Sequence, residues 1–141
     1  LITRHSHLDS EQREKVLALI ASATDVDGIP PVAEHVLLHL RHGGDKEDFH
    51  LLAEESGEIL GYAHLDLTDQ VEGPSAEIVV APMYRGKGIG DQLVAKVQEF
   101  AGAKLRLWSH GDLPGAKNLA LKNGLKHFSN RHPDAPFAYR S

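Results

Sequence analysis

Apolar positions in the first forty residues recur at the spacing of amphipathic helices. The segment 9–23 carries an apolar stripe among charged residues, and it begins with Asp9 or Ser10, either of which can cap a helix. Glycine and paired prolines at 28–31 cannot continue a helix, so the first helix ends before them. A second apolar stripe predicts a shorter helix over 32–40.

The middle of the chain changes to the pattern of β-strands. Two apolar runs, 50–53 and 59–63, flank a polar segment that contains Ser56-Gly57, which is typical of an antiparallel hairpin. A polar linker then leads into a short apolar strand over 76–80.

The last third alternates between the two patterns. We predict a long helix over 88–101, a strand over 105–108, and a helix from Pro114 to Lys122 that ends at Gly124. The weak apolar pattern of the tail 126–141 predicts two short strands around His132-Pro133. The predicted order is two helices, three strands, a helix, a strand and a helix, followed by this tail.

Length and charge limit the classes of protein that fit this order. The 141 residues suit one domain, and with no cysteine the chain has neither a disulfide framework nor a thiolate nucleophile. A net charge of −5 argues against nucleic-acid binding. No apolar run approaches the roughly 20 residues that span a bilayer, so we expect a cytoplasmic protein without membrane contact.

The ten histidines are scattered along the chain. His5 and His7 lie two residues apart, and His39 and His42 lie three apart. Because no other ligand-bearing residue converges on either pair in the sequence, we expect solvated histidines and no metal site.

The most specific feature is a glycine-rich turn between the strand 76–80 and the helix that follows. Gly86, Gly88 and Gly90 let backbone N–H groups approach an anion closely, and the helix N-terminus adds further donors. With Arg85 and Lys87 adding positive charge, this turn predicts a pyrophosphate site. The spacing fits neither a Rossmann turn nor a P-loop, while a plain glycine turn stays open as the alternative.

Residues 79–90 resemble the acetyl-CoA signature of GNAT N-acetyltransferases, Arg/Gln-x-x-Gly-x-Gly/Ala after a strand. The resemblance implies an α/β GNAT fold: a mixed, mostly antiparallel sheet flanked by helices, with a strand that splays from its neighbour at the acetyl-CoA site. It implies acetyl-CoA as the acetyl donor and an amine as the small-molecule substrate. The splayed residues Ile78, Val79 and Val80 would pair with the pantetheine arm. The pyrophosphate would be held by Arg85, Gly86, Lys87, Gly88, Ile89, Gly90 and the backbone N–H of Asp91.

Three further segments, 24–34, 76–80 and 107–111, resemble the amino-terminal half of tandem GNAT enzymes that acetylate the cysteinyl amine of a glucosaminyl-inositol. We therefore expect residues 1–141 to form one GNAT domain, with a second GNAT domain in the full-length chain. The resemblance implies that Glu34 contacts the amino sugar. A solvated charge at the start of a helix is the alternative.

Catalysis by this domain alone depends on which residues could act as base and acid. The resemblance implies that Glu77 is a general base, while alternation along its strand equally allows a carboxylate on the solvent side. Ala120 stands where many GNAT enzymes have an acid-donating tyrosine, and His110 and Tyr84 are possible replacements. Three functions stay open: acetyl transfer to the cysteinyl amine, a degenerate acetyl-CoA-binding module, and a stand-alone acetyltransferase acting on another amine.

Overall fold

The computed structural model describes residues 1–42, 48–102, 104–109, 114–128 and 137–140. The strands are β1 Ile2–His5, β2 Asp48–Glu55, β3 Glu58–Asp66, β4 Ser75–Val80, β5 Arg106–Ser109, β6 Lys126–Phe128 and β7 Phe137–Arg140. The helices are α1 Ser10–Asp27, α2 Glu34–His42, α3 Ile89–Ala101 and α4 Pro114–Lys122, and a 3-10 turn, η1, spans Pro82–Tyr84. Among the described residues, no helix is long and apolar enough to cross a membrane.

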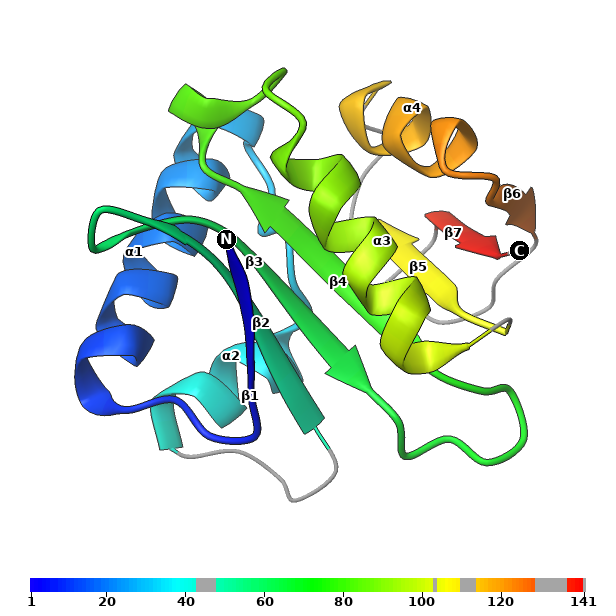
Figure 1. Ribbon diagram of the computed structural model, residues 1–141, viewed down its shortest axis with the longest axis horizontal. Helices are drawn as coiled ribbons and strands as arrows, with labels where there is room; N and C mark the ends of the chain where they lie inside the picture. Colours follow the sequence, from blue (N-terminus) through cyan, green and yellow to red (C-terminus); the bar gives the residue numbers. More distant parts are fainter. Residues whose placement is uncertain (43–47, 103, 110–113, 129–136, 141) are drawn as a thin grey trace.

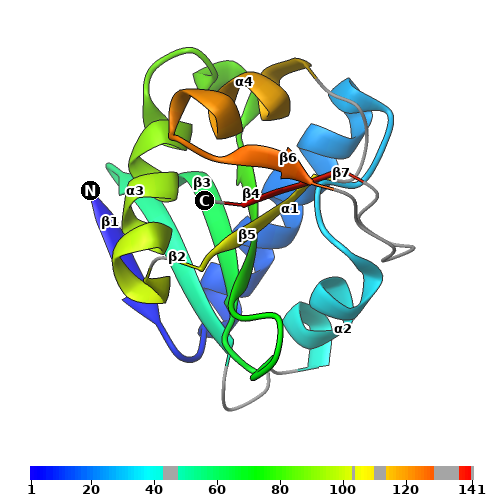
Figure 2. The same ribbon diagram turned by 90° about the vertical axis from the view of Figure 1, so that its right-hand side faces the viewer.

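The strands form one sheet of seven in the order β1-β2-β3-β4-β5-β7-β6. Its neighbours are antiparallel except for β4 and β5, which run parallel. Helices α1 and α2 cover one face of the sheet, and α3 and α4 cover the other, as Figures 1 and 2 show. The central strand β3 is buried along most of its length because helices lie on both of its faces.

Two apolar cores hold these layers together, one on each face. Between α3, α4 and the sheet, Leu93, Val94 and Val97 pack with strand residues such as Leu65. Between α1, α2 and the sheet, the core is made by Val16, Leu19, Ile20, Ala23, Val32, Val36, Leu40, Leu52, Tyr62 and Val79. Both cores meet at β4, so the strand that leads to the glycine turn is held from both sides.

The predicted elements are all present, with small shifts in their bounds. Helix α1 begins after Asp9, which forms a capping box with Gln12, and it ends at Gly28 in the left-handed conformation. The tail forms the two strands β6 and β7, while His132-Pro133 lies outside the described residues.

Strand β1 was not predicted. It has only 4 residues and too short a pattern to stand out from a loop. It exists because the open edge of β2 gives it a partner, from Ile2 opposite Ala53 to His5 opposite His50.

The prediction that the histidines are solvated is wrong for His50 and His64. They are 4% and 2% exposed and lie opposite each other on β2 and β3, with ring centroids 5.7 Å apart. A hydrogen bond of 2.6 Å joins His50 Nδ1 to the Tyr62 hydroxyl, and one of 3.1 Å joins His64 Nε2 to Asp48 Oδ2. Strand alternation turns these rings inward, under α1 and α2, and hydrogen-bonding partners from neighbouring strands make their burial tolerable.

Candidate functional site

Strands β4 and β5 are paired at one end and diverge along the rest of their length. Their pairing covers Ser75 with Arg106 and Ala76 with Leu107. On its other edge β4 stays paired with β3 as far as Val80, which lies opposite Gly61. The backbone of residues 78–80 therefore has one edge turned toward the space between the diverging strands, which confirms the predicted splay.

A pocket of about 510 Å³ lies at this divergence. Its lining comes from the second half of β4, the glycine turn, the first turn of α3, the end of β5, α4 and β7. Of the predicted cofactor-binding residues, 78–80, 85–86 and 88–91 line it. The structure thus brings together on one cavity the strand edge and the turn that the sequence had linked.

The glycine turn has a backbone conformation that side chains disfavour. Gly86 and Gly88 have φ values of 78° and 85°, in the left-handed region. A Cβ at either position would meet no described atom within 4 Å, so conformation rather than space requires glycine there. Gly88 is the N-cap of α3 and has no side chain to cap the helix, so the first N–H groups of α3 remain available to an anion.

Gly90 is needed for a different reason, which is close packing. A Cβ there would lie 3.2 Å from both Leu119 methyl groups and 3.6 Å from Val80 Cγ2. Gly61 on β3, which the sequence analysis did not single out, is tighter still, at 2.9 Å from Leu93 Cδ1. These two glycines let α3 sit close to the sheet and to α4, which sets the position of its N-terminus.

The two predicted cations at the turn are both engaged within the chain. Arg85 donates a bidentate pair of hydrogen bonds to Asp27, at 2.7 and 2.8 Å, and this carboxylate raises the pKa of Arg85. The Lys87 ammonium lies 5.5 Å from the ring centroid of Tyr84. Lys87 is not among the described residues that line the pocket. An anion at the turn would therefore meet mainly backbone N–H groups.

Asp91, an acid in the first turn of α3, has its carboxylate bound by residues at the end of α4. Lys122 Nζ donates to it at 2.9 Å and Asn123 Nδ2 at 3.0 Å, and these bonds lower the pKa of Asp91. The carboxylate thus ties α3 to α4, which supports the prediction that Asp91 offers its backbone N–H rather than its side chain.

Glu77 lies on β4 just before the splayed residues. It is 3% exposed, and its Oε2 accepts a hydrogen bond of 2.7 Å from the backbone N–H of Ala33. The alternative of a solvent-facing carboxylate is therefore wrong. Glu34 is exposed at the start of α2, and neither glutamate is among the described residues that line the pocket.

Several lining residues were not predicted. Asp27 comes from the end of α1, Trp108 and Ser109 from the end of β5, Lys122 from α4 and Tyr139 from β7. The sequence gives a signal for the β5 pair, since the end of a strand beside a splay must face the gap. No local pattern marks Tyr139, which arrives through the pairing of β7 with β5.

The structure describes Ala120 and one of its two possible replacements as general acid, Tyr84. Ala120 is fully buried in the core under α4. Tyr84 is one of the residues that line the pocket, and its hydroxyl donates to Glu58 Oε2 at 3.1 Å, which raises the pKa of Tyr84. His110 lies outside the described residues.

Sequence comparison finds relatives among curated proteins named mycothiol acetyltransferase. The chain is 47% identical over 126 residues to mycothiol acetyltransferase of Acidothermus cellulolyticus, which covers 87% of this chain and 38% of that protein. It is 45% identical over 123 residues to mycothiol acetyltransferase of Streptosporangium roseum, covering 87% of this chain and 36% of that protein. The chain thus spans little more than a third of the length of these relatives.

Solved structures with the same fold cover nearly the whole chain. An acetyltransferase of the GNAT family from Staphylococcus aureus Mu50 matches with a TM-score of 0.74 at 16% identity, covering 99% of this chain and 97% of that one. PaiA N-acetyltransferase of Thermoplasma acidophilum, crystallised with coenzyme A, matches with a TM-score of 0.71 at 17% identity, covering 100% and 99%. The family model described as "Acetyltransferase (GNAT) family" matches residues 15–125. The chain belongs to this acetyltransferase family and has its fold.

Proposed function

We propose that the pocket between β4 and β5 binds acetyl-CoA. The observation that carries this proposal is the meeting of three features on one cavity: the splayed edge of 78–80, the left-handed glycine turn and the N-terminus of α3. An extended chain with amide groups can pair with the first, and a pyrophosphate suits the other two. The residues present therefore fit this cofactor.

Each part of the site has a distinct task in this proposal. The backbone of Ile78–Val80 pairs with the pantetheine arm as an added strand. The backbone N–H groups of Gly86–Gly90 and of Asp91 bind the pyrophosphate, and Arg85 and Lys87 add positive charge at its rim. When bound, acetyl-CoA supplies the thioester whose acetyl group is transferred.

We further propose that the chain is the amino-terminal half of a two-domain N-acetyltransferase. Its substrate would be the cysteinyl amine of cysteinyl-glucosaminyl-inositol, and its product mycothiol. The support is the identity of 45–47% to proteins named mycothiol acetyltransferase, together with coverage of only 36–38% of their length. That coverage leaves room for a second GNAT domain as a partner.

Acetyl transfer to the cysteinyl amine needs little help from acid–base groups of the protein. A cysteinyl α-amine has a pKa of about 8, so removing its proton at pH 7 costs only about 1 kcal/mol. Glu77 remains the candidate base, since it precedes the splayed residues on β4 and the Ala33 N–H fixes its orientation. Glu34, at the start of α2, is the candidate contact for the amino sugar.

A second candidate function is an acetyl-CoA-binding domain without catalysis. The observation that favours it is the buried Ala120, at the position where many family members carry a tyrosine acid. General acid catalysis is typically worth about 10²–10⁴-fold in rate, so its loss leaves transfer slow. A stand-alone enzyme for another amine is the third candidate, and substrate tests distinguish it.

Calorimetric titration with acetyl-CoA tests the binding proposal. Gly88→Ala and Gly57→Ala form a matched pair, because both glycines have φ near 80° (85° and 80°) and a Cβ at either would meet no described atom within 4 Å. Gly57 lies in the β2–β3 turn and is not among the described residues of the pocket. Both changes should cost about 1–2 kcal/mol of stability, while Gly88→Ala alone should weaken binding about tenfold. Equal binding by both variants, or no binding by the unmodified chain, contradicts the proposal.

A thiol-release assay with cysteinyl-glucosaminyl-inositol then separates the functions. Thiol release with this amine supports acetyl transfer by the domain itself. Tight binding without release by any amine supports the cofactor-binding domain. Release with other amines but not with this one supports a different acetyltransferase.

A further inference from the structure

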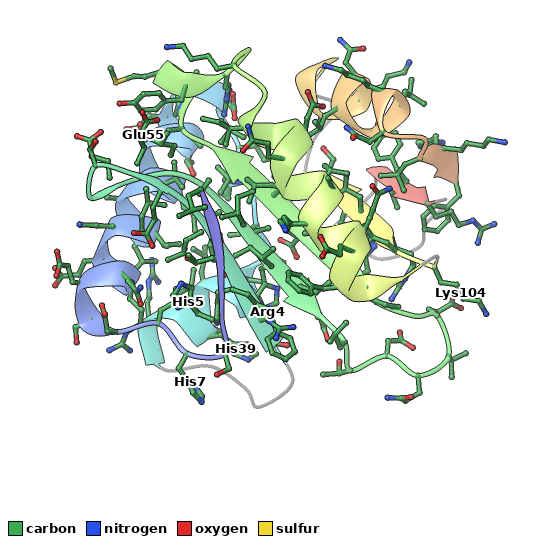
Figure 3. All side chains as sticks on the ribbon, in the orientation of Figure 1. Arg4, His5, His7, His39, Glu55 and Lys104 are labelled. Carbon is green, nitrogen blue, oxygen red and sulfur yellow. The ribbon has the colours of Figure 1, made fainter. Side chains whose placement is uncertain are left out.

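Three metal-ligating side chains converge beneath α2, on the face of the sheet opposite the helix α3. His39 comes from α2, Asp48 from the start of β2 and His64 from β3. His39 Nδ1 lies 3.0 Å from Asp48 Oδ2, and His64 Nε2 lies 3.1 Å from the same oxygen. The three ligand atoms all lie within 4.8 Å of one another. Figure 3 labels His39 at the lower end of the molecule in this orientation.

The spacing of these atoms is close to that of a tetrahedral metal site. With metal–ligand bonds of about 2.0–2.2 Å, neighbouring ligands of a zinc ion are about 3.3–3.5 Å apart. The two nitrogen–oxygen distances of 3.0 and 3.1 Å fall only a few tenths of an ångström short of this. The two nitrogens also lie within 4.8 Å of each other, so small side-chain adjustments can bring all three atoms onto one ion.

The burial of the three side chains is uneven in a way that suits a metal site. Asp48 and His64 are 3% and 2% exposed, so two ligands are held rigidly within the protein. The side chain of His39 is 30% exposed, which gives an ion a route in from solvent and leaves this ligand room to adjust. Two imidazoles and one carboxylate on three different elements are a donor set that favours zinc and its neighbours over calcium or magnesium.

We propose that His39 Nδ1, Asp48 Oδ2 and His64 Nε2 form a binding site for a divalent metal ion of the zinc type. The three protein ligands leave a fourth tetrahedral position for water. The ion fastens α2 to strands β2 and β3, in a chain that has no cysteine to supply another crosslink. The site lies at the level of Glu77 along β4, since His64 is opposite Glu77, whereas Val80, which adjoins the glycine turn, is opposite Gly61.

This location gives the ion an influence on the acceptor side of the domain. Helix α2 begins at Glu34, directly after Ala33, whose N–H binds the Glu77 carboxylate. A metal that fixes α2 on the sheet therefore also fixes the segment that orients Glu77. The acetyl-CoA pocket itself, built on the other end of β4, does not depend on the ion.

Metal binding to the untagged chain, freed of metal by chelation and dialysis, tests the proposal. Zn²⁺ should bind at one equivalent per chain and raise the melting temperature, and Mg²⁺ should not. Co²⁺ used as a spectroscopic probe should give the visible absorption of a tetrahedral ion, and acetyl-CoA affinity should be the same with and without metal.

Three variants locate the site. Asp48→Asn keeps the size of the side chain and removes the anionic ligand, and His39→Ala removes the partly exposed ligand on a surface helix. Both should weaken Zn²⁺ binding at least tenfold, while His7→Ala, which removes an exposed histidine, should leave it unchanged. The proposal is overturned if Zn²⁺ does not bind at one equivalent. It is equally overturned if both ligand variants bind as the unmodified chain does, in which case the three side chains serve only as a hydrogen-bonded network.

Discussion

The glycine turn and the polar cluster under α2 achieve polar recognition in opposite ways. The turn offers backbone groups of residues 78–91, adjacent in sequence, and its side chains bind partners elsewhere in the chain, as Arg85 does with Asp27. The cluster uses side chains from α2, β2 and β3, which only folding brings together. A local backbone site depends on conformation and packing, whereas a dispersed side-chain site depends on each partner. Substitutions that affect one should leave the other largely intact.

The largest effect should come from filling the space at Gly90. Valine there would place branched methyl groups against Leu119 and Val80, whose atoms lie 3.2 and 3.6 Å from the position of a Cβ. Helices α3 and α4 must separate, and the N–H groups of α3 then miss the pyrophosphate. We expect acetyl-CoA affinity to fall by about 100-fold, equivalent to about 3 kcal/mol, in calorimetric titration.

A double variant shows whether packing is the cause. Adding Leu119→Ala to Gly90→Val removes the colliding methyl groups and should restore a large part of the affinity. If the double variant binds as poorly as Gly90→Val alone, the loss does not arise from this contact. Zn²⁺ binding under α2 should be unchanged in both variants.

Glu77 links the two regions, and its role can be divided by two substitutions. Glu77→Gln keeps an oxygen to accept the Ala33 N–H, whereas Glu77→Ala leaves that buried donor without its carboxylate. The alanine variant should therefore lose about 1–3 kcal/mol of unfolding free energy in urea, and the glutamine variant less. If Glu77 is the base, thiol release should fall about 100-fold in both.

The exposed Glu72→Gln serves as the control for a lost negative charge. Normal thiol release by Glu77→Gln, across a pH range in which the unmodified chain is active, would show that Glu77 only orients the segment at Ala33.

The sequence predicts a local site such as the glycine turn better than a site assembled from distant residues. The turn was predicted because glycine, strand and helix signals are contiguous, and the splay beside it, which the family resemblance implied, was found. The sequence did not reveal that Arg85 is bound to Asp27, since 58 positions separate them. Nor did it reveal Gly61, whose need for glycine comes from Leu93 on another element.

The burial of His50 and His64 also could not be predicted from the local sequence. His50 and His64 look like polar interruptions of apolar strands, and only the pairing of β2 with β3 shows that both point into one buried layer. Strand β1 was missed for a related reason, because four residues gain their structure from the edge of β2. Local periodicity carries no information about which strands become neighbours.

The buried histidine layer should make the metal-free protein sensitive to acid. Burial lowers the pKa of His50 from 6.5 to about 4, with His64, His5 and His7 adding to the decrease and Asp48 opposing it. Between these values the unfolded chain binds the proton and the folded chain does not, so stability falls as the pH decreases. From pH 7 to pH 5 the unfolding free energy should drop by about 2 kcal/mol on account of this residue.

Urea unfolding in the presence of a chelator, at both pH values, measures this drop. His50→Asn places an amide near the position of Nδ1 and cannot be protonated, so it should remove most of the pH dependence. His127→Asn, at an exposed histidine on β6 that does not contribute to the pKa of His50, should keep it. The same acid sensitivity in His50→Asn as in the unmodified chain would assign the effect to another group.

The smallest effect should come from the ion pair at the turn. Asp27→Asn removes the carboxylate that holds Arg85 at 2.7 and 2.8 Å, leaving the guanidinium free to approach a phosphate and removing a negative charge from the pocket lining. Acetyl-CoA affinity should rise about threefold at low salt, and the gain should shrink with added salt because the pair is near the surface. Asp25→Asn, an exposed acid on the same helix, removes the same charge without touching Arg85 and should have a smaller effect. Weaker binding by Asp27→Asn would mean that Asp27 holds Arg85 in its binding position, so that the turn depends on a side-chain partner after all.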